Sequence, residues 1–121
     1  TDYPFKFDWF RGKSFDTFAP LGPWLVPASC IEDPQNLRLT LDVNGERKQD
    51  DTTASMIFSV AEQISYLSGI VTLRPGDVIA TGTPDGVGMG MGQYLKPGDV
   101  LTASVESVGV LRNPVAAAAT H

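Results

Sequence analysis

The sequence predicts an α+β fold that is mainly β, with one helix over residues 56–68 covering a sheet. Three observations support this prediction. Apolar residues alternate strictly ahead of a turn dipeptide, one stretch has apolar residues at helical spacing, and a Pro-Gly-Asp turn occurs twice. With 121 residues, of which 42% are hydrophobic and 19% charged, the chain is long enough for a single domain, residues 1–121, with a modest core.

The alternation lies in residues 37–43, where every second side chain is apolar. A period of two places these side chains on one face of a strand. Asn44-Gly45 follows directly and supplies the residues that a type I′ turn requires, so we expect a β-hairpin. The return strand begins at Glu46 and is polar, which indicates a sheet edge or a surface that meets a ligand or partner.

The helix is expected over residues 56–68 because apolar side chains recur there every three or four residues. These positions are Ile57, Val60, Ile64 and Leu67. The polar residues 50–55 can cap the start of the helix, and Gly69 stands where a C′ glycine is common. The helix would have about three and a half turns.

Pro75-Gly76-Asp77 and Pro97-Gly98-Asp99 each predict a type II turn that feeds a strand, because Pro presets the first central φ and Gly takes the positive φ of the next. Their aspartates are therefore turn residues first and catalytic candidates second. Residues 100–115 are expected to form two strands broken near Gly109, and residues 24–26 a short buried strand closed by Pro27.

The charge balance excludes two classes of partner. Fourteen acidic and nine basic residues give a net charge of −5, and no Lys or Arg cluster offers the positive surface that nucleic acids or anionic membranes require. No apolar run approaches the roughly 20 residues that span a bilayer. The sequence therefore predicts no nucleic-acid and no membrane partner.

Cys30 is the single cysteine and His121, the last residue, is the single histidine. A lone cysteine forms no internal disulfide, and we expect a small buried hydrophobe in a reducing, cytoplasmic setting. Ser-His-Asp and Cys-His catalysis need a positioned imidazole, and zinc sites draw on His or several Cys. Carboxylate, lysine and hydroxyl chemistry remain.

Two loops concentrate the candidate groups. Residues 11–24 carry Lys13, hydroxyls and a carboxylate between glycines and prolines, on backbone expected to be neither helix nor strand. Residues 81–92 repeat glycine without a helical pattern, which indicates a mobile loop whose N–H groups can approach an anion, although the pattern by itself favours a plain flexible hairpin loop. Residues 1–11 are rich in aromatic side chains and fit an extended or lid-like segment, or core.

A set of short motifs runs in order along almost the whole chain. They are Gly12-Lys13-Ser14-Phe15-Asp16-Thr17, Pro20-Leu21-Gly22-Pro23-Trp24, Val43-Asn44-Gly45-Glu46 with Gln49, Met56-Ile57-Phe58, Leu73-Arg74-Pro75-Gly76-Asp77-Val78-Ile79, Thr81-Gly82-Thr83-Pro84-Asp85-Gly86-Val87-Gly88 and Leu111-Arg112-Asn113-Pro114-Val115. The set resembles the fumarylacetoacetate hydrolase family, in its bacterial branch that acts on 2-oxo and diketo acids. The resemblance implies a mixed β-sheet roll or sandwich with one covering helix, and a homodimer.

The family resemblance also implies a site. A hard divalent cation, Mg²⁺ with Mn²⁺ or Ca²⁺ as alternatives, would chelate a small 2-oxo acid substrate and stabilise its enolate. Lys13 corresponds to the catalytic lysine beside the metal and Thr17 to a threonine associated with the cation. Gly82 and Thr83 correspond to the contact with the substrate carboxylate. The alternatives are a surface ion pair with Asp16 for Lys13 and turn capping for the threonines.

The metal carboxylates of the family, a Glu-x-Glu pair and a later Asp, lie upstream of the part that this chain matches, and no residue of this chain corresponds to them. The leading hypothesis is therefore the C-terminal part of a larger catalytic domain, from a Mg²⁺-dependent enzyme that cleaves, decarboxylates or isomerises a small 2-oxo or diketo acid. This chain alone would be inactive. The alternative is a non-catalytic β-rich binding or assembly module on the same scaffold.

Overall fold

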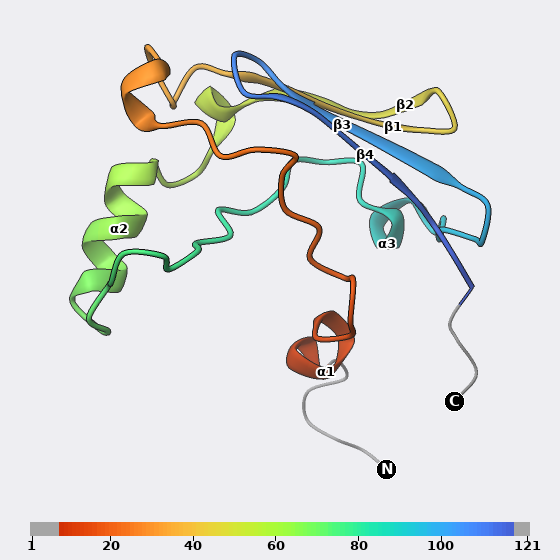
Figure 1. Ribbon diagram of the computed structural model, residues 1–121, viewed down its shortest axis with the longest axis horizontal. Helices are drawn as coiled ribbons and strands as arrows, with labels where there is room; N and C mark the ends of the chain where they lie inside the picture. The colour runs from red at the N-terminus through yellow and green to blue at the C-terminus, as the bar shows by residue number, and fades with distance from the viewer. Residues whose placement is uncertain (1–7, 118–121) are drawn as a thin grey trace.

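The computed structural model describes residues 8–117, and the segments 1–7 and 118–121, with His121, lie outside the described part. A four-stranded sheet in the order β2-β1-β3-β4 dominates it (Figure 1). All three pairings are antiparallel, whereas a mixed sheet was expected. The fold class is confirmed as α+β, mainly β.

The first hairpin joins β1 (Arg38–Val43) to β2 (Glu46–Thr52). Asn44 and Gly45 at its tip have φ values of 54° and 83°, both positive, as a type I′ turn requires. The hairpin is confirmed. The pairing shifts register between Leu41 and Asp42, which leaves Lys48 as the extra residue of a β-bulge.

The second pair is β3 (Val100–Val105) with β4 (Gly109–Pro114), separated by a turn that ends at Gly109 as expected. The type II turns are confirmed as well, since Gly76 and Gly98 have φ values of 98° and 96°. The Asp77 and Asp99 carboxylates accept from the N–H groups of Arg74 and Lys96, which makes both aspartates turn residues.

The described helices are short. They comprise α1 (Trp9–Lys13), the 3₁₀ turns η1 (Ala28–Cys30) and η2 (Thr53–Ser55), α2 (Val60–Ser68) and α3 (Gly88–Met91). The α2 helix starts later than the expected residue 56, because Ser59 and Glu62 form a capping box. Gly69 has a φ of −77° and is therefore not a left-handed C′ residue.

Four local expectations are wrong. Residues 24–26 form no strand, since Pro23 and Pro27 enclose them and no neighbouring strand pairs with them. Residues 78–79 also form none. The glycine loop contains α3, which Gly92 ends in the left-handed region at a φ of 64°. Cys30 is exposed instead of buried.

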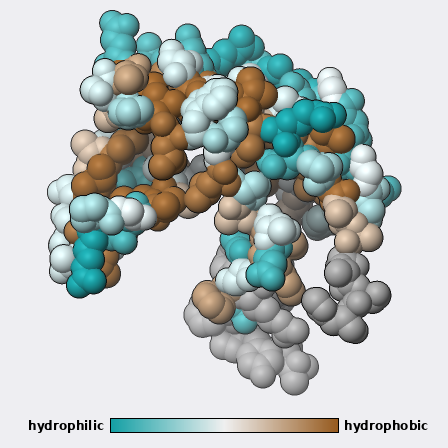
Figure 2. All heavy atoms as spheres, in the orientation of Figure 1, coloured by the Kyte–Doolittle hydropathy of each residue, from teal (hydrophilic) through white to brown (hydrophobic). Residues whose placement is uncertain are grey.

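The expected core is absent from residues 12–117, where no hydrophobic side chain is buried. Leu39 and Leu41 of β1 lie opposite Val105 and Ala103 of β3, so these side chains share one face of the sheet. Figure 2 shows hydrophobic residues gathered on the side of the sheet that looks toward α2. A single sheet with one short helix at its edge leaves this face only partly covered.

Candidate functional site

The loop that carries Gly82 and Thr83 is held on β2 by one side chain. Gln49 Nε2 donates to Thr83 Oγ1 at 2.9 Å, to the Pro84 carbonyl at 2.9 Å and to the Asp85 carbonyl at 3.1 Å. Gln49 is 9% exposed and is the one buried polar residue in the described part of the chain. The turn-capping alternative for Thr83 is therefore replaced by a long-range anchor.

Gly86 brings the same loop against the backbone of β2. A Cβ built on Gly86 would lie 2.0 Å from the Lys48 carbonyl oxygen, and its φ is 96°, so only glycine fits this approach. Gly82 also has a positive φ, of 102°, and a Cβ built on it would have no atom within 4 Å. The loop is thus fixed at residues 83–86, while Gly82 and Thr83 stay exposed at its surface.

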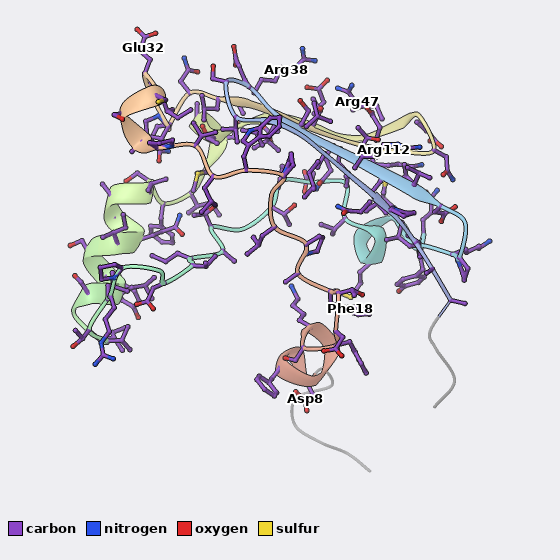
Figure 3. All side chains as sticks on the ribbon, viewed as in Figure 1. Asp8, Phe18, Glu32, Arg38, Arg47 and Arg112 are labelled. Carbon is purple, nitrogen blue, oxygen red and sulfur yellow. The ribbon has the colours of Figure 1, made fainter. Side chains whose placement is uncertain are left out.

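Lys13 lies at the end of α1, which corrects the expectation of irregular backbone. The helical turn forms because Gly12 N–H donates to the Asp8 carbonyl at 2.9 Å, and Ser14 Oγ then donates to the Phe10 carbonyl at 2.6 Å. The Lys13 side chain is exposed. Figure 3 shows Asp8 beside this helix, well away from the strands.

Thr17 lies in a turn with unusual backbone. Phe18 N–H donates to the Phe15 carbonyl at 3.1 Å, and the two rings pack at 5.2 Å between centroids. This places Thr17 at the third position of a β-turn with a φ of 70°, a region that β-branched residues rarely occupy. Such strain is concentrated at functional sites in folded proteins, and it is the one structural feature that distinguishes Thr17.

Trp24 ties this N-terminal segment to the sheet. Its Nε1 donates to the Val108 carbonyl at 2.6 Å, in the turn between β3 and β4. The indole ring lies directly over Gly109, where an added Cβ would come within 2.8 Å of the ring. Figure 1 shows the segment running from α1 up to the sheet.

The metal that the family resemblance implies does not fit the described residues. Within residues 8–117 no three or more His, Cys, Asp or Glu side chains are grouped so that they could hold an ion. Thr17 offers a single hydroxyl oxygen, whereas Mg²⁺ and Mn²⁺ take several oxygen ligands. No step of a reaction is therefore assigned to a metal on this chain.

The largest group of charged side chains lies on the face of the sheet opposite the apolar one. These side chains form ion pairs with one another. Arg38 pairs with Asp50 at 2.7 Å, and Arg47 contacts both Asp42 and Asp50. The hydrogen bond from Arg38 lowers the pKa of the Asp50 carboxyl. Figure 3 shows Arg38 and Arg47 projecting on the side away from α1. These carboxylates are consequently not available as ligands of the candidate site.

The structure thus joins Thr83 to β2 and the segment of Lys13 and Thr17 to the turn between β3 and β4. It leaves α1 standing apart from the sheet (Figure 1), so the convergence of Lys13 and Thr83 on one ligand stays a prediction. Gln49 was not among the predicted site residues. The sequence pattern could have indicated Gln49, because it is a polar residue paired with Leu41, on the face of the hairpin where apolar side chains are expected.

Residues 1–116 match the family described as fumarylacetoacetate (FAA) hydrolase, C-terminal. The chain belongs to this family. No helix in the described part of the chain is long and apolar enough to cross a bilayer.

The relatives include hydrolases and an isomerase. The 2,4-didehydro-3-deoxy-L-rhamnonate hydrolase of Sphingomonas sp. (strain SKA58) is 50% identical over 110 residues, 88% of this chain and 39% of that protein. The 2-hydroxyhepta-2,4-diene-1,7-dioate isomerase from Mycobacterium marinum has a TM-score of 0.80 and 42% identity, over 89% of this chain and 40% of that one.

Maleylpyruvate hydrolase from Sphingobium sp. SYK-6 was solved in complex with manganese(II) ion and pyruvate. It has a TM-score of 0.79 and 36% identity, over 84% of this chain and 37% of that chain. The chain therefore spans less than half the length of the relatives it matches.

Proposed function

We propose that this chain is the C-terminal part of a divalent-metal-dependent enzyme that acts on a small 2-oxo or diketo acid. The reaction would be C–C bond hydrolysis, decarboxylation or keto-enol isomerisation. The observation that carries the proposal is the family match over residues 1–116, together with relatives named for hydrolysis and isomerisation of such acids.

Within this site we assign three roles to residues of this chain. The Lys13 ammonium stabilises negative charge that develops on a substrate oxygen, as a charge held beside the reacting group does. The Thr83 hydroxyl and the Gly82 backbone bind the substrate carboxylate. Thr17 lies near the cation, and its strained backbone supports a functional role.

The divalent cation, Mg²⁺ or Mn²⁺, would be held mainly by carboxylates outside this chain. When bound, such an ion polarises a carbonyl and stabilises an enolate. The manganese in the maleylpyruvate hydrolase structure supports a divalent cation for that relative, and we extend it to the full-length protein that contains this chain.

The uncovered apolar face of the sheet supports placing residues 1–121 within a larger catalytic domain. Exposed contiguous apolar surface of this kind marks contact with further protein. We assign that contact to the remainder of the domain and, in a homodimer, to a second copy. A cytoplasmic location stays a prediction from the single cysteine.

The test is turnover of acetylpyruvate, a small diketo acid, by the full-length protein with Mg²⁺, with Mn²⁺ and with excess chelator. We expect activity with either metal and loss of it in chelator. Calorimetric titration with Mg²⁺ plus oxalate, an enolate mimic, is run in parallel. Absence of both turnover and oxalate binding would contradict the proposal and favour a non-catalytic module.

A further inference from the structure

We propose that Gln49 is a positioning residue that sets the direction of the Thr83 hydroxyl proton, so that Thr83 donates to the carboxylate of a bound acid. This inference rests on the proposed function of the Gly82 and Thr83 loop. It goes beyond that function by naming the side chain that determines what the loop binds.

Gln49 occupies an unusual place in the sheet. It pairs with Leu41 and so lies on the face that carries Leu39, Ala103 and Val105. A buried amide on an apolar face lowers stability unless its polar atoms are hydrogen-bonded. Gln49 is nonetheless the most buried polar residue described, and its amide nitrogen contacts only the loop of residues 83–85.

The neighbours of the Gln49 side chain determine the orientation of its amide. The carbonyl oxygens of Pro84 and Asp85 can only accept hydrogen bonds, so the group that faces them must be the Gln49 NH₂. The same nitrogen lies 2.9 Å from Thr83 Oγ1 and can only donate to it. The Thr83 oxygen is therefore an acceptor toward Gln49, and its own proton points elsewhere.

Gln49 and the loop are held at two further points of β2. The bulge at Lys48 precedes Gln49, and bulges redirect neighbouring side chains. The close approach of Gly86 to the Lys48 carbonyl fixes the other end of the loop. Two contacts with adjacent β2 residues, at Thr83 and at Gly86, thus hold this loop, and the Gln49 N–H that faces Thr83 Oγ1 keeps the hydroxyl proton directed away from Gln49.

The chemical consequence is a site that donates. Thr83 is exposed and presents O–H, and Gly82 beside it offers backbone N–H without a side chain. An exposed pair of donors suits a carboxylate and disfavours an ammonium or other donor group. A substrate without a carboxylate would lose this contact.

The experiment replaces Gln49→Glu in the full-length protein, which keeps the shape and removes the donor. The new carboxylate would face the two loop carbonyls and attract the Thr83 proton. The matched control is Gln63→Glu, because the Gln63 amide also donates to a carbonyl, that of Phe58 at 2.9 Å, but at helix α2. KM and kcat for acetylpyruvate, oxalate affinity and amide hydrogen exchange of residues 82–86 are measured for each.

For Gln49→Glu we expect KM and the oxalate Kd to rise about tenfold or more, as for a lost hydrogen bond to a charged group, with little change in kcat. In a Thr83→Val background the same change should add little, since the two residues act as one unit. Gln63→Glu should match the wild type. A wild-type KM in Gln49→Glu, or an equal effect in the Thr83→Val background, would overturn the inference.

Measurements on the wild-type protein distinguish a failure of the proposed function from a failure of the inference about Gln49. If wild type neither turns over acetylpyruvate nor binds oxalate, the function proposal fails, and hydrogen exchange decides the role of Gln49. Faster exchange at residues 82–86 in Gln49→Glu then supports its positioning role. Unchanged exchange refutes it.

Discussion

Asn44 and Asp99 join two turns that are far apart in the sequence. Asn44 Nδ2 donates to Asp99 Oδ1 at 2.8 Å, and Asn44 Oδ1 accepts from the N–H of Val100 at 2.9 Å. These two hydrogen bonds connect the tip of the first hairpin to the type II turn that precedes β3. These contacts help to align β1 with β3, the central pair of the sheet.

The variant Asn44→Gly tests how much these hydrogen bonds contribute to stability. Glycine tolerates the φ of 54°, so the change removes the two side-chain hydrogen bonds without adding backbone strain. We expect a loss of about 1–3 kcal/mol in the free energy of unfolding, measured by urea unfolding of the full-length protein. An unchanged midpoint and slope of the unfolding transition would show that these hydrogen bonds contribute nothing to stability.

The same variant has a predicted pH dependence. The hydrogen bond from Asn44, followed by that from the Lys96 N–H, lowers the pKa of Asp99 in the folded state. The stability this provides is present above the ordinary aspartate pKa and is lost as the pH falls through the lowered one. The stability difference between wild type and Asn44→Gly should therefore shrink on acidification through that range. A difference independent of pH would contradict the assignment.

Gly109→Ala should destabilise the protein through Trp24. The new methyl group would meet the indole ring at 2.8 Å, and the backbone φ of 138° is unfavourable for alanine. The matched control is Gly45→Ala, where φ is 83° but no atom lies within 4 Å. Overpacking typically costs about 1–3 kcal/mol, so Gly109→Ala should lower the melting temperature more than Gly45→Ala. Equal shifts would mean that Trp24 does not pack on Gly109.

The isolated 121-residue chain should lack cooperative unfolding. No hydrophobic side chain is buried in the described residues, so there is no packed core to melt as a unit. We expect a broad thermal transition and binding of a hydrophobic dye, and full-length protein should show neither. A sharp transition without dye binding would show that the chain folds independently.

Local backbone chemistry made much of the fold predictable. Asn44-Gly45 and the two Pro-Gly-Asp turns demand positive φ at known positions, and all of them adopt it. The start of α2 could also have been predicted, because Ser59 and Glu62 have the spacing of a capping box. The expectation of a start at residue 56 gave more weight to apolar periodicity than to that cap.

Long-range contacts could not be predicted in the same way. Gln49 and Thr83 are 34 residues apart, and no pattern within either segment indicates the other. The segment at residues 24–26 has strand composition but is held by the indole hydrogen bond of Trp24 to Val108, 84 residues away. Composition also predicted a modest core. Burial of apolar side chains, however, depends on which layers are present to cover the sheet, and composition does not indicate these layers.

The central claim is that Lys13 stabilises negative charge on a substrate whose carboxylate Thr83 binds. The most direct test is the kcat of full-length Lys13→Ala for acetylpyruvate, with its melting temperature as the control for folding. We predict a fall of about 10² to 10³ in kcat with little change in melting temperature, as for loss of one preorganised charge-stabilising group. Wild-type turnover in the folded variant would contradict the account.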